Sequence, residues 1–370
     1  MPASAPELAH LRFALAMHRA VAGEADTCFS PYSTASALGL AATAARGDTA
    51  SELTTLLAGA DSGLADQADL LRKAAVLEAR AGQDEPLLAV ANTLWAWEGL
   101  PVEPGFAEAI VDWPSGGVSQ APFAEDPEGA RTAINRDVAD ITRELIPELL
   151  PPGTVGDDTV ACLVNALYLR VGWVHPFAPA DTVDADFHTP GGALPVRMMR
   201  QTERLGYAEH GGWQLVSLPA VGGVEAVVLL PDRRLADLES TLDEFTLAEL
   251  LAARRDRLVR LSLPRVSLDV RSPLKAALRA LGVRRMFTPG ADFGALTDDP
   301  RLVISDVLHQ AVLRLDESGL EGAAATAAMM RLVSMPVGEP VTVEVNRPFL
   351  LLVRHGGSGA VYFLARVVEP

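Results

Sequence analysis

The chain has 370 residues, of which 49% are hydrophobic and 21% charged, close to the usage of an ordinary globular protein. This composition excludes a mainly disordered, collagen-like or low-complexity chain. The 31 Lys and Arg residues against 48 Asp and Glu give a formal charge of −17. A surface this acidic repels nucleic-acid backbones and anionic lipids, so we expect no nucleic-acid partner and no membrane partner.

The two cysteines, Cys28 and Cys162, lie in apolar runs without metal-binding or redox spacing, and we interpret both as buried core residues. The sequence contains no run of 18 apolar residues, the length needed to span a bilayer, so we expect no transmembrane segment. The N-terminal residues lack the basic segment of a signal peptide and predict an amphipathic helix. As it stands the chain is expected to be cytoplasmic, with export by a removed leader left open. Lysine occurs only at positions 73 and 275; GC-rich coding is the favoured reason and adaptation to heat a weaker one.

The first half of the chain predicts mainly helices. Ser30 followed by Pro31 is an N-cap with proline at the first helical position. Apolar residues at spacings of three and four indicate further amphipathic helices. Helices are expected at about 31–46, 50–57, 64–82 and 128–150, and a first long strand at 87–95.

The second half predicts mainly strands. The apolar run 160–171 is typical of a buried central strand, and glycine pairs at 191–192, 211–212 and 222–223 mark hairpins between short strands. Helices are expected at 245–254 and at 272–282, the second capped by Ser272. Further strands are expected near 302–316, 341–346, 348–354 and 360–368. Without a repeat or a linker, the pattern predicts one α+β domain over residues 1–370.

The sequence lacks the usual catalytic signatures. Phosphate-loop, dinucleotide-binding and zincin motifs do not occur, and the seven histidines show no metal-ligand spacing, so we expect no cofactor and no metal. The segment around Ser358 is near to a nucleophile elbow but has Ala360 in place of the final glycine and joins two strands. We expect a hairpin turn there, and a serine hydrolase is the least favoured hypothesis. His309, inside an apolar strand, is interpreted as structural.

Residues 315–336 form the most unusual segment, about twenty residues without a packing stripe after a predicted strand. An alanine-rich helix from about Glu321 is one interpretation, which helix propensity favours. Long loops in compact domains are, however, usually functional. Because glycine and alanine need little side-chain room, such a segment could also enter an existing sheet as an extra strand.

This segment and its flanks resemble the hinge and reactive-centre loop of a serpin of the prokaryotic type. The resemblance is collinear from Phe29 to Pro370, with Ala365 where the family usually has glycine. The matching motifs are FSPYS at 29–33, ARGDT at 45–49, ANTL at 91–94, IN at 134–135, LVNALYL at 163–169 with Trp173 and Phe177, VRMM at 196–199, LP at 230–231 and 263–264, ADF at 291–293, RPFL at 347–350 and YFLARV at 362–367.

The resemblance implies a serpin fold of about nine helices and three β-sheets with an exposed reactive-centre loop. It also implies a monomeric inhibitor, not an enzyme, that is used once. The target serine protease would cleave the loop, become covalently linked to it and be displaced as the loop inserts into the main sheet. The hinge and loop would span residues 317–336, with hinge residues Glu317, Gly319, Leu320, Glu321, Gly322, Ala323, Ala324, Ala325 and Thr326.

The resemblance also places the reactive bond and the residues that control sheet opening. Counting fifteen residues from Gly319 puts the bond between Val333 and Ser334, which favours elastase- or chymotrypsin-like targets. Alternative bond residues are Met330, Arg331 and Leu332. A salt bridge between Glu317 and Arg265 is expected at the top of the main sheet, with Trp173 nearby. A hydrogen-bonded cluster is expected below it, formed by Ser30, Ser33, Asn165 and His309.

The alternative within the family is a non-inhibitory serpin that acts as a binding or chaperone-like protein. On insertion, residues 320, 322, 324, 326, 328 and 330 would face the core, and none of them is charged or proline. This pattern favours inhibition. Leu320 and Gly322 depart from the family pattern, and the bulk of Leu320 is expected to slow the first step of insertion.

Overall fold

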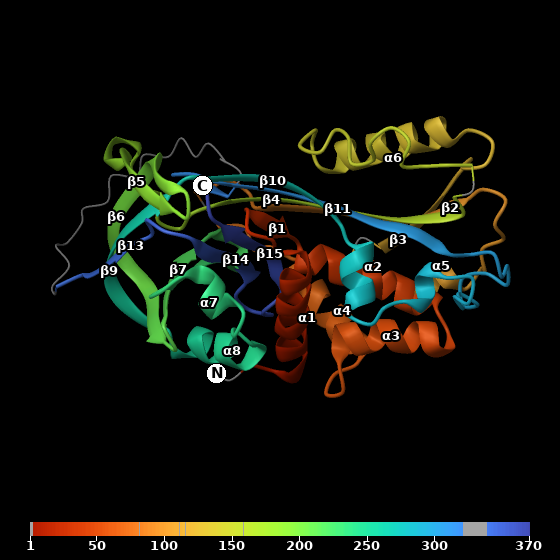
Figure 1. Ribbon diagram of the computed structural model, residues 1–370, viewed down its shortest axis with the longest axis horizontal. Coiled ribbons are helices and arrows are strands. Elements are labelled where there is room, and N and C mark those ends of the chain that lie inside the picture. Colours follow the sequence, from red (N-terminus) through yellow and green to blue (C-terminus); the bar gives the residue numbers. More distant parts are fainter. Residues whose placement is uncertain (1–2, 81, 111, 115, 158, 321–338) are drawn as a thin grey trace.

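The computed structural model describes residues 3–80, 82–110, 112–114, 116–157, 159–320 and 339–370, which fold into two β-sheets with helices packed around them (Figure 1). In Figure 1, α6 covers one face of the sheet that contains β2, β4 and β11, and α2 lies on the other. The α-helices are α1 Ala5–Val21, α2 Pro31–Ala44, α3 Gly47–Ala58, α4 Leu64–Ala74, α5 Phe106–Ala109, α6 Pro127–Ile141, α7 Leu235–Glu239, α8 Glu244–Ala253 and α9 Lys275–Ala280.

The six-stranded sheet has the order β10-β11-β12-β4-β2-β3. Its strands are β10 Val266–Pro273, β11 Ile304–Leu315, β12 Gly319–Leu320, β4 Ala161–Gly172, β2 Leu87–Trp97 and β3 Gly116–Ala121. Over most of their length β11 and β4 pair directly and in parallel, and only at one end does the two-residue β12 lie between them. We call the direct pairing, from Ile304 opposite Ala161 to Ala311 opposite Leu167, the seam.

The nine-stranded sheet has the order β1-β15-β14-β8-β7-β6-β9-β13, with β5 paired to the start of β6. Its strands are β1 Thr27–Phe29, β5 Val183–Thr189, β6 Gly192–His210, β7 Trp213–Pro219, β8 Val224–Pro231, β9 Arg255–Pro264, β13 Val341–Glu344, β14 Phe349–His355 and β15 Val361–Val367. The early part of β6 pairs with β5 and its last part with β7. Of the three β-sheets that the resemblance implies, two are therefore joined here into one continuous sheet through β6.

Local chemistry accounts for the starts of the helices. The Ser30 hydroxyl caps α2 by accepting a hydrogen bond from the Ser33 N–H, and Pro31 occupies the first turn. Asp126 caps α6 in the same way through the Gly129 N–H. Both cysteines are buried, as the sequence predicts. Burial raises the pKa of the Cys162 thiol to about 12, so it is protonated at neutral pH.

Two of the predicted helices end earlier than expected. The helix expected at 64–82 ends at Ala74. The helix expected at 128–150 ends at Ile141, because Arg143 and Glu144 have left-handed backbone angles of φ 51° and 63°. The apolar spacing continued past the true end because residues up to Leu150 fold back into the same buried cluster as α6.

Two other expectations also need correction. Ser272 does not cap a helix, because it lies in β10 opposite His309, and α9 begins only at Lys275. The short strands expected across 182–231 include one strand of 19 residues, β6, because β9 pairs along its middle. The three glycine pairs do fall at chain turns, as predicted.

Candidate functional site

The start of the expected hinge already lies within the six-stranded sheet. Gly319 pairs with Gly172, and Leu320 pairs with Val171 of β4 on one side and with Leu315 of β11 on the other. β12 is antiparallel to both neighbours. Residues 319–320, the start of the expected hinge, therefore lie in the sheet at the end of the seam, between β11 and β4.

Gly319 and Leu320 are each suited to this position. A Cβ atom on Gly319 would lie 2.1 Å from the Val171 carbonyl oxygen, a backbone atom that cannot move aside cheaply, so only glycine fits. Leu320 is 1% exposed and belongs to the main hydrophobic core. Its bulk, expected from the sequence to slow insertion, is thus already accommodated in this structure.

The turn before β12 is fixed by Asp316 and Trp173. The Asp316 carboxylate accepts hydrogen bonds from the N–H groups of Ser318 and Gly319 at 2.8 and 3.2 Å. The Trp173 ring, 1% exposed, donates from Nε1 to the Asp316 carbonyl at 2.8 Å, and its backbone N–H donates to the Ser318 carbonyl at 2.9 Å. Trp173 therefore lies beside the hinge, as the resemblance implies.

The Glu317–Arg265 ion pair expected from the sequence is present above the seam. Arg265 donates from Nη2 to Glu317 Oε1 at 2.8 Å and from Nε to Oε2 at 3.0 Å, and the Thr182 hydroxyl donates to Oε1 at 2.5 Å. Burial raises the pKa of Glu317, but the hydrogen bonds from Arg265 and Thr182 outweigh it, and the pKa lies below its ordinary value. Glu317 is thus charged and paired with Arg265 and Thr182 two residues before the start of β12.

His309 and Asn165 lie directly opposite each other across the seam. His309 Nε2 accepts a hydrogen bond from the Ser30 backbone N–H at 3.0 Å, so its proton is on Nδ1 and is donated to Asn165 Oδ1 at 2.7 Å. Burial lowers the pKa of His309 to about 4, so the ring is neutral at physiological pH. The predicted cluster therefore joins β11 to β4 through an uncharged bond.

Asn92 completes this cluster, and the sequence reasoning did not select it as a site residue. Its Oδ1 accepts from Asn165 Nδ2 at 2.5 Å and from the Ser33 hydroxyl at 3.4 Å. Asn92 is fully buried and pairs in register with Asn165. The signal that could have found it is an asparagine in the middle of an otherwise apolar buried strand.

Several expected site residues lie outside the described residues. They are the hinge residues Glu321, Gly322, Ala323, Ala324, Ala325 and Thr326, the reactive-bond residues Val333 and Ser334, and the alternative bond residues Met330, Arg331 and Leu332. Their assignments stay predictions.

Ser358 and His355 contact each other within the turn between β14 and β15. Ser358 Oγ lies 3.0 Å from His355 Nδ1, and that nitrogen also accepts from the Ser358 backbone N–H, so the pair closes the turn between β14 and β15. This is the hairpin that the sequence predicts. Across the described part of the chain, no cluster of three or more His, Cys, Asp or Glu residues could hold a metal.

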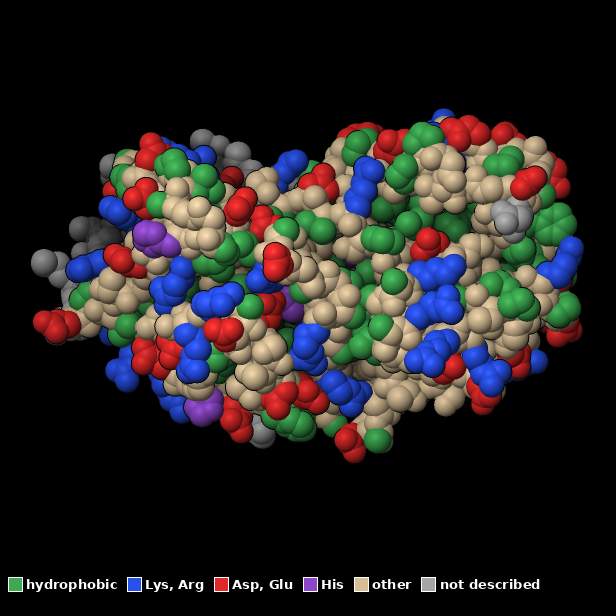
Figure 2. Space-filling model, in the orientation of Figure 1, with side chains coloured by type: hydrophobic (Ala, Val, Ile, Leu, Met, Phe, Trp, Pro, Cys, Tyr) green, Lys and Arg blue, Asp and Glu red, His purple; other side chains and the backbone are tan. Residues whose placement is uncertain are grey.

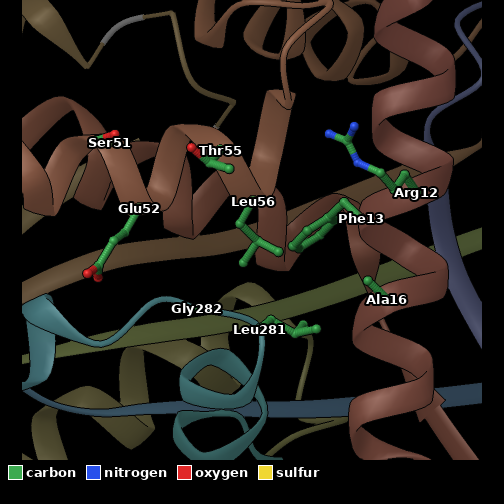
Figure 3. A pocket seen from close by; sticks show the side chains of 9 residues that line it. All are labelled: Arg12, Phe13, Ala16, Ser51, Glu52, Thr55, Leu56, Leu281 and Gly282. Atoms are coloured by element: carbon green, nitrogen blue, oxygen red, sulfur yellow. The ribbon is translucent and has the colours of Figure 1, made fainter.

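A cavity of about 410 Å³ lies between α1, α3 and the end of α9 (Figure 3). Its acidic residue, Glu52, accepts hydrogen bonds at Oε2 from the N–H groups of Arg284 and Arg285 at 2.7 and 2.8 Å, so it holds the residues after α9. The lining residues are Arg12, Phe13, Ala16, Ser51, Glu52, Thr55, Leu56, Leu281 and Gly282.

Acidic and basic side chains are mixed over the face shown in Figure 2, and acidic side chains gather over α6. The exposed acids there include Glu125, Glu128 and Asp140. None of the helices that the model describes is both long and apolar enough to cross a membrane.

Comparison with known proteins places this architecture. The family model described as "Serpin (serine protease inhibitor)" matches residues 9–370. Serpin-Z2A of Oryza sativa subsp. japonica is 30% identical over 95% of this chain and 93% of its own length. Ipis-1 of Ixodes persulcatus is 30% identical over 92% of this chain and 91% of its own.

Solved structures show the same fold. Uncleaved ovalbumin has 25% identity and a TM-score of 0.83, covering 98% of this chain and 99% of its own. The native state of tengpin, a thermophilic serpin, has 24% identity and a TM-score of 0.86, covering 98% of this chain and 94% of its own. Thyroxine-binding globulin in complex with thyroxine has 22% identity and a TM-score of 0.86, covering 98% and 99%.

Proposed function

Because the chain belongs to the serpin family, a family of serine protease inhibitors, we propose that it traps a serine protease by inserting its cleaved reactive-centre loop into the six-stranded sheet. The observation that carries this proposal is the position of β12, which already lies between β11 and β4 and runs antiparallel to both. Continued insertion would lengthen this strand along the seam.

The strand directions supply a driving force. The seam is a parallel pairing, and an inserted loop would replace it with two antiparallel pairings, which are slightly more stable per residue. The new strand would also gain roughly ten or more backbone hydrogen bonds at about 0.5–1.5 kcal/mol each. The native chain is therefore held by a kinetic barrier, because the loop cannot insert while both of its ends are tethered.

In the proposed chemistry the hydroxyl of the protease serine attacks the carbonyl carbon of Val333. The C–N bond to Ser334 breaks, the Ser334 nitrogen leaves as an amine, and an ester joins Val333 to the protease. Insertion then displaces the protease before water hydrolyses that ester. A small β-branched residue before the bond suits an elastase-like pocket, and Leu332 and Met330 would suit a chymotrypsin-like one; both classes are the proposed targets.

In the non-inhibitory alternative, the same fold would bind a ligand or partner without trapping a protease. Thyroxine-binding globulin, solved in complex with thyroxine, is an example of binding by that protein. For this chain, the glycine and alanine content of residues 319–328 favours insertion.

The test is to mix the protein with elastase and with chymotrypsin and to separate the products on a denaturing gel. The proposal predicts a covalent complex that survives SDS. In the matched variant Ala324→Arg, insertion would bury an unpaired charge, so the loop should be cleaved without complex formation. A wild-type loop that is cleaved without any complex would favour the non-inhibitory alternative.

Mass spectrometry of the cleaved loop should place the cut after Val333, and a cut after Arg331 would contradict the predicted targets.

A further inference from the structure

Arg271 on β10 contacts the segment that connects α6 to β4. Its Nη2 donates a hydrogen bond to the Glu148 backbone carbonyl at 2.6 Å. β10 and β11 lie on one side of the seam, and the 142–160 connection leads from α6 into β4 on the other. This bond therefore joins β10, on one side of the seam, to the connection that leads into β4 on the other side.

Strand register places Arg271 on the face covered by α6. Arg271 lies opposite Gln310, and Gln310 lies opposite Ala166 of β4. Side chains opposite one another on neighbouring strands share a face, and Ala166 belongs to the buried cluster under α6. The preceding row, His309 and Asn165, faces α2. His309 and Gln310, which are consecutive in β11, therefore take part in hydrogen bonding on the two opposite faces of the sheet. His309 bonds to Asn165, and Gln310 holds Arg271, which bonds to Glu148.

A buried amide fixes the direction of the Arg271 side chain. Arg271 Nε donates to Gln310 Oε1 at 3.1 Å, and Gln310 Nε2 donates to Asp269 Oδ1 at 2.5 Å. Gln310 is 3% exposed, so its amide has no freedom to turn to solvent. The guanidinium is exposed, but it is held in place by this amide.

The other end of the bond is fixed to α6. Arg131, on α6, donates from Nη1 to the Glu148 carboxylate at 3.0 Å and to the Leu150 carbonyl at 2.7 Å. Asn135 exchanges two hydrogen bonds with the Leu150 backbone, at 2.8 and 2.9 Å. The segment that accepts the bond from Arg271 therefore moves with α6.

We propose that Arg271 is a positioning residue that ties β10 to the α6–β4 connection and must release Glu148 before the loop can insert. Neighbouring strands lie about 4.7–4.9 Å apart, so one inserted strand would move the two ends of this 2.6 Å bond beyond contact. That the bond from Arg271 to Glu148 must break rests on the proposed insertion. That this bond holds β10 to the α6–β4 connection does not.

The test is amide hydrogen exchange at the seam, measured for residues 163–167 and 307–311 of the uncleaved protein. Arg271→Ala should speed exchange there by about 2–10-fold, the range of one hydrogen bond of about 0.5–1.5 kcal/mol. The matched control is Lys275→Ala, which removes a bond from a long cationic side chain to the Ser305 carbonyl at 2.7 Å without crossing the seam. Arg271→Lys should restore part of the protection. Equal exchange in Arg271→Ala and Lys275→Ala would overturn the proposal.

A second readout separates this proposal from the proposed function. A synthetic peptide with the sequence of residues 320–333 is added to the intact protein, and its incorporation is followed by the rise in melting temperature. Arg271→Ala should incorporate the peptide several-fold faster than Lys275→Ala. If exchange at the seam rises but no variant forms a covalent complex with a protease, the tie stands and the inhibitory function fails. If complexes form but exchange is unchanged, the function stands and the tie fails.

Discussion

The two sheets of this protein differ in the interactions that hold each of them together. Across the seam, His309 and Asn165 share a bond between neutral groups, and Arg271 donates to a backbone carbonyl. The nine-stranded sheet instead contains ion pairs with little solvent exposure. Breaking a neutral buried bond costs about 1–3 kcal/mol, whereas removing one partner of a buried ion pair costs about 3–5 kcal/mol. The region proposed to open thus uses the cheaper ties.

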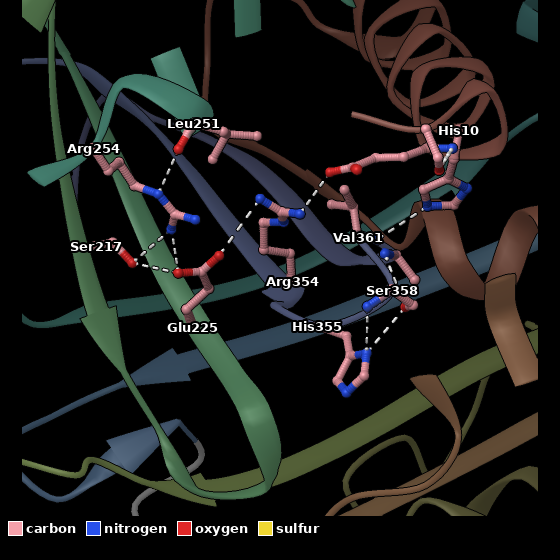
Figure 4. Close-up of polar contacts among 12 residues, drawn as sticks. His10, Ser217, Glu225, Leu251, Arg254, Arg354, His355, Ser358 and Val361 are labelled. Carbon is pink, nitrogen blue, oxygen red and sulfur yellow. Dashed lines mark hydrogen bonds and ion pairs between the residues drawn. The ribbon is translucent and has the colours of Figure 1, made fainter. Parts of the chain in front are cut away.

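The ion pairs of the nine-stranded sheet centre on Arg354 of β14 (Figure 4). Its side chain is 4% exposed and donates from Nη2 to Glu7 of α1 at 2.8 Å, while Nη1 lies 3.5 Å from Glu225 of β8. Glu225 also pairs with Arg254 and accepts a hydrogen bond from Ser217 at 2.6 Å. This network ties α1 to β14 and β8.

A second buried cluster links the same helix to β15 through Glu239 of α7. Glu239 of α7 lies 2.5 Å from His18 of α1 and 3.0 Å from Arg366 of β15. Residues near both ends of α1 are therefore linked, directly or through α7, to a sheet that has no role in the proposed insertion.

The largest expected effect comes from breaking this network. Arg354→Met should lower the free energy of unfolding by about 3–5 kcal/mol, because Glu7 loses its ion-pair partner in a largely buried site. Urea denaturation measures the change. The control is Arg204→Met, whose pair with Asp256 is more than half exposed and should contribute less than about 1 kcal/mol. Equal losses in the two variants would show that the buried network does not stabilise this sheet as argued.

The next effect concerns the hinge. Gly319→Ala should force β12 out from between its neighbours, because the new Cβ would lie 2.1 Å from the Val171 oxygen. We expect a cost of about 1–3 kcal/mol and faster amide exchange at Leu320. Gly117→Ala is the matched control in the same sheet, since a Cβ there meets nothing within 4 Å. If Leu320 exchanges at the wild-type rate in Gly319→Ala, the close fit of the hinge is not what holds it.

The third prediction compares His309 at the seam with His10 of α1, whose Nε2 accepts a hydrogen bond from the Val361 N–H of β15 at 3.0 Å. Burial lowers the pKa of both His10 and His309 to about 4, against about 6.5 in the unfolded chain. The unfolded state therefore binds more protons between pH 4 and 6.5, and stability must fall as pH falls through that window. At pH 5 each histidine should cost about 2 kcal/mol of folding stability relative to pH 7.

Replacing either histidine by glutamine should flatten the pH profile of unfolding, but only His309→Gln should raise amide exchange at the seam. Equal exchange in the two variants would contradict the separation of the regions.

The smallest effect is expected at the Glu317 ion pair. Arg265 is 47% exposed, so Arg265→Ala should cost about 1 kcal/mol or less in a thermal melt at pH 7. The pKa of Glu317 is lowered, so the stability from this pair is present above the unfolded value of about 4.3 and is lost as pH falls below it. The deficit of the variant should therefore shrink below about pH 4. A deficit that stays constant with pH would exclude the charge of Glu317 as its cause.

Much of the fold could be predicted because its strands are apolar runs. The run at 160–171 became β4, and the glycine pairs marked real turns. The ends of α4 and α6 could not be predicted, because apolar periodicity continues wherever a chain folds back on the same core. The end of α6 depends on the left-handed conformations at Arg143 and Glu144, which neither residue type signals.

The site residues were placed by the overall family resemblance and not by the sequence pattern alone. That resemblance put His309, Asn165, Glu317 and Arg265 near their observed partners. The Arg271 bond joins residues 123 positions apart, through a side chain and a backbone carbonyl. Because any residue type supplies such a carbonyl, the sequence held no signal for it.

The central claim is that the native chain is less stable than its loop-inserted form. The most direct measurement compares thermal melts of the intact protein and of the protein cleaved within residues 321–338. Loop insertion predicts a clearly higher melting temperature for the cleaved form, because the freed loop completes the six-stranded sheet. Equal melting temperatures would contradict it.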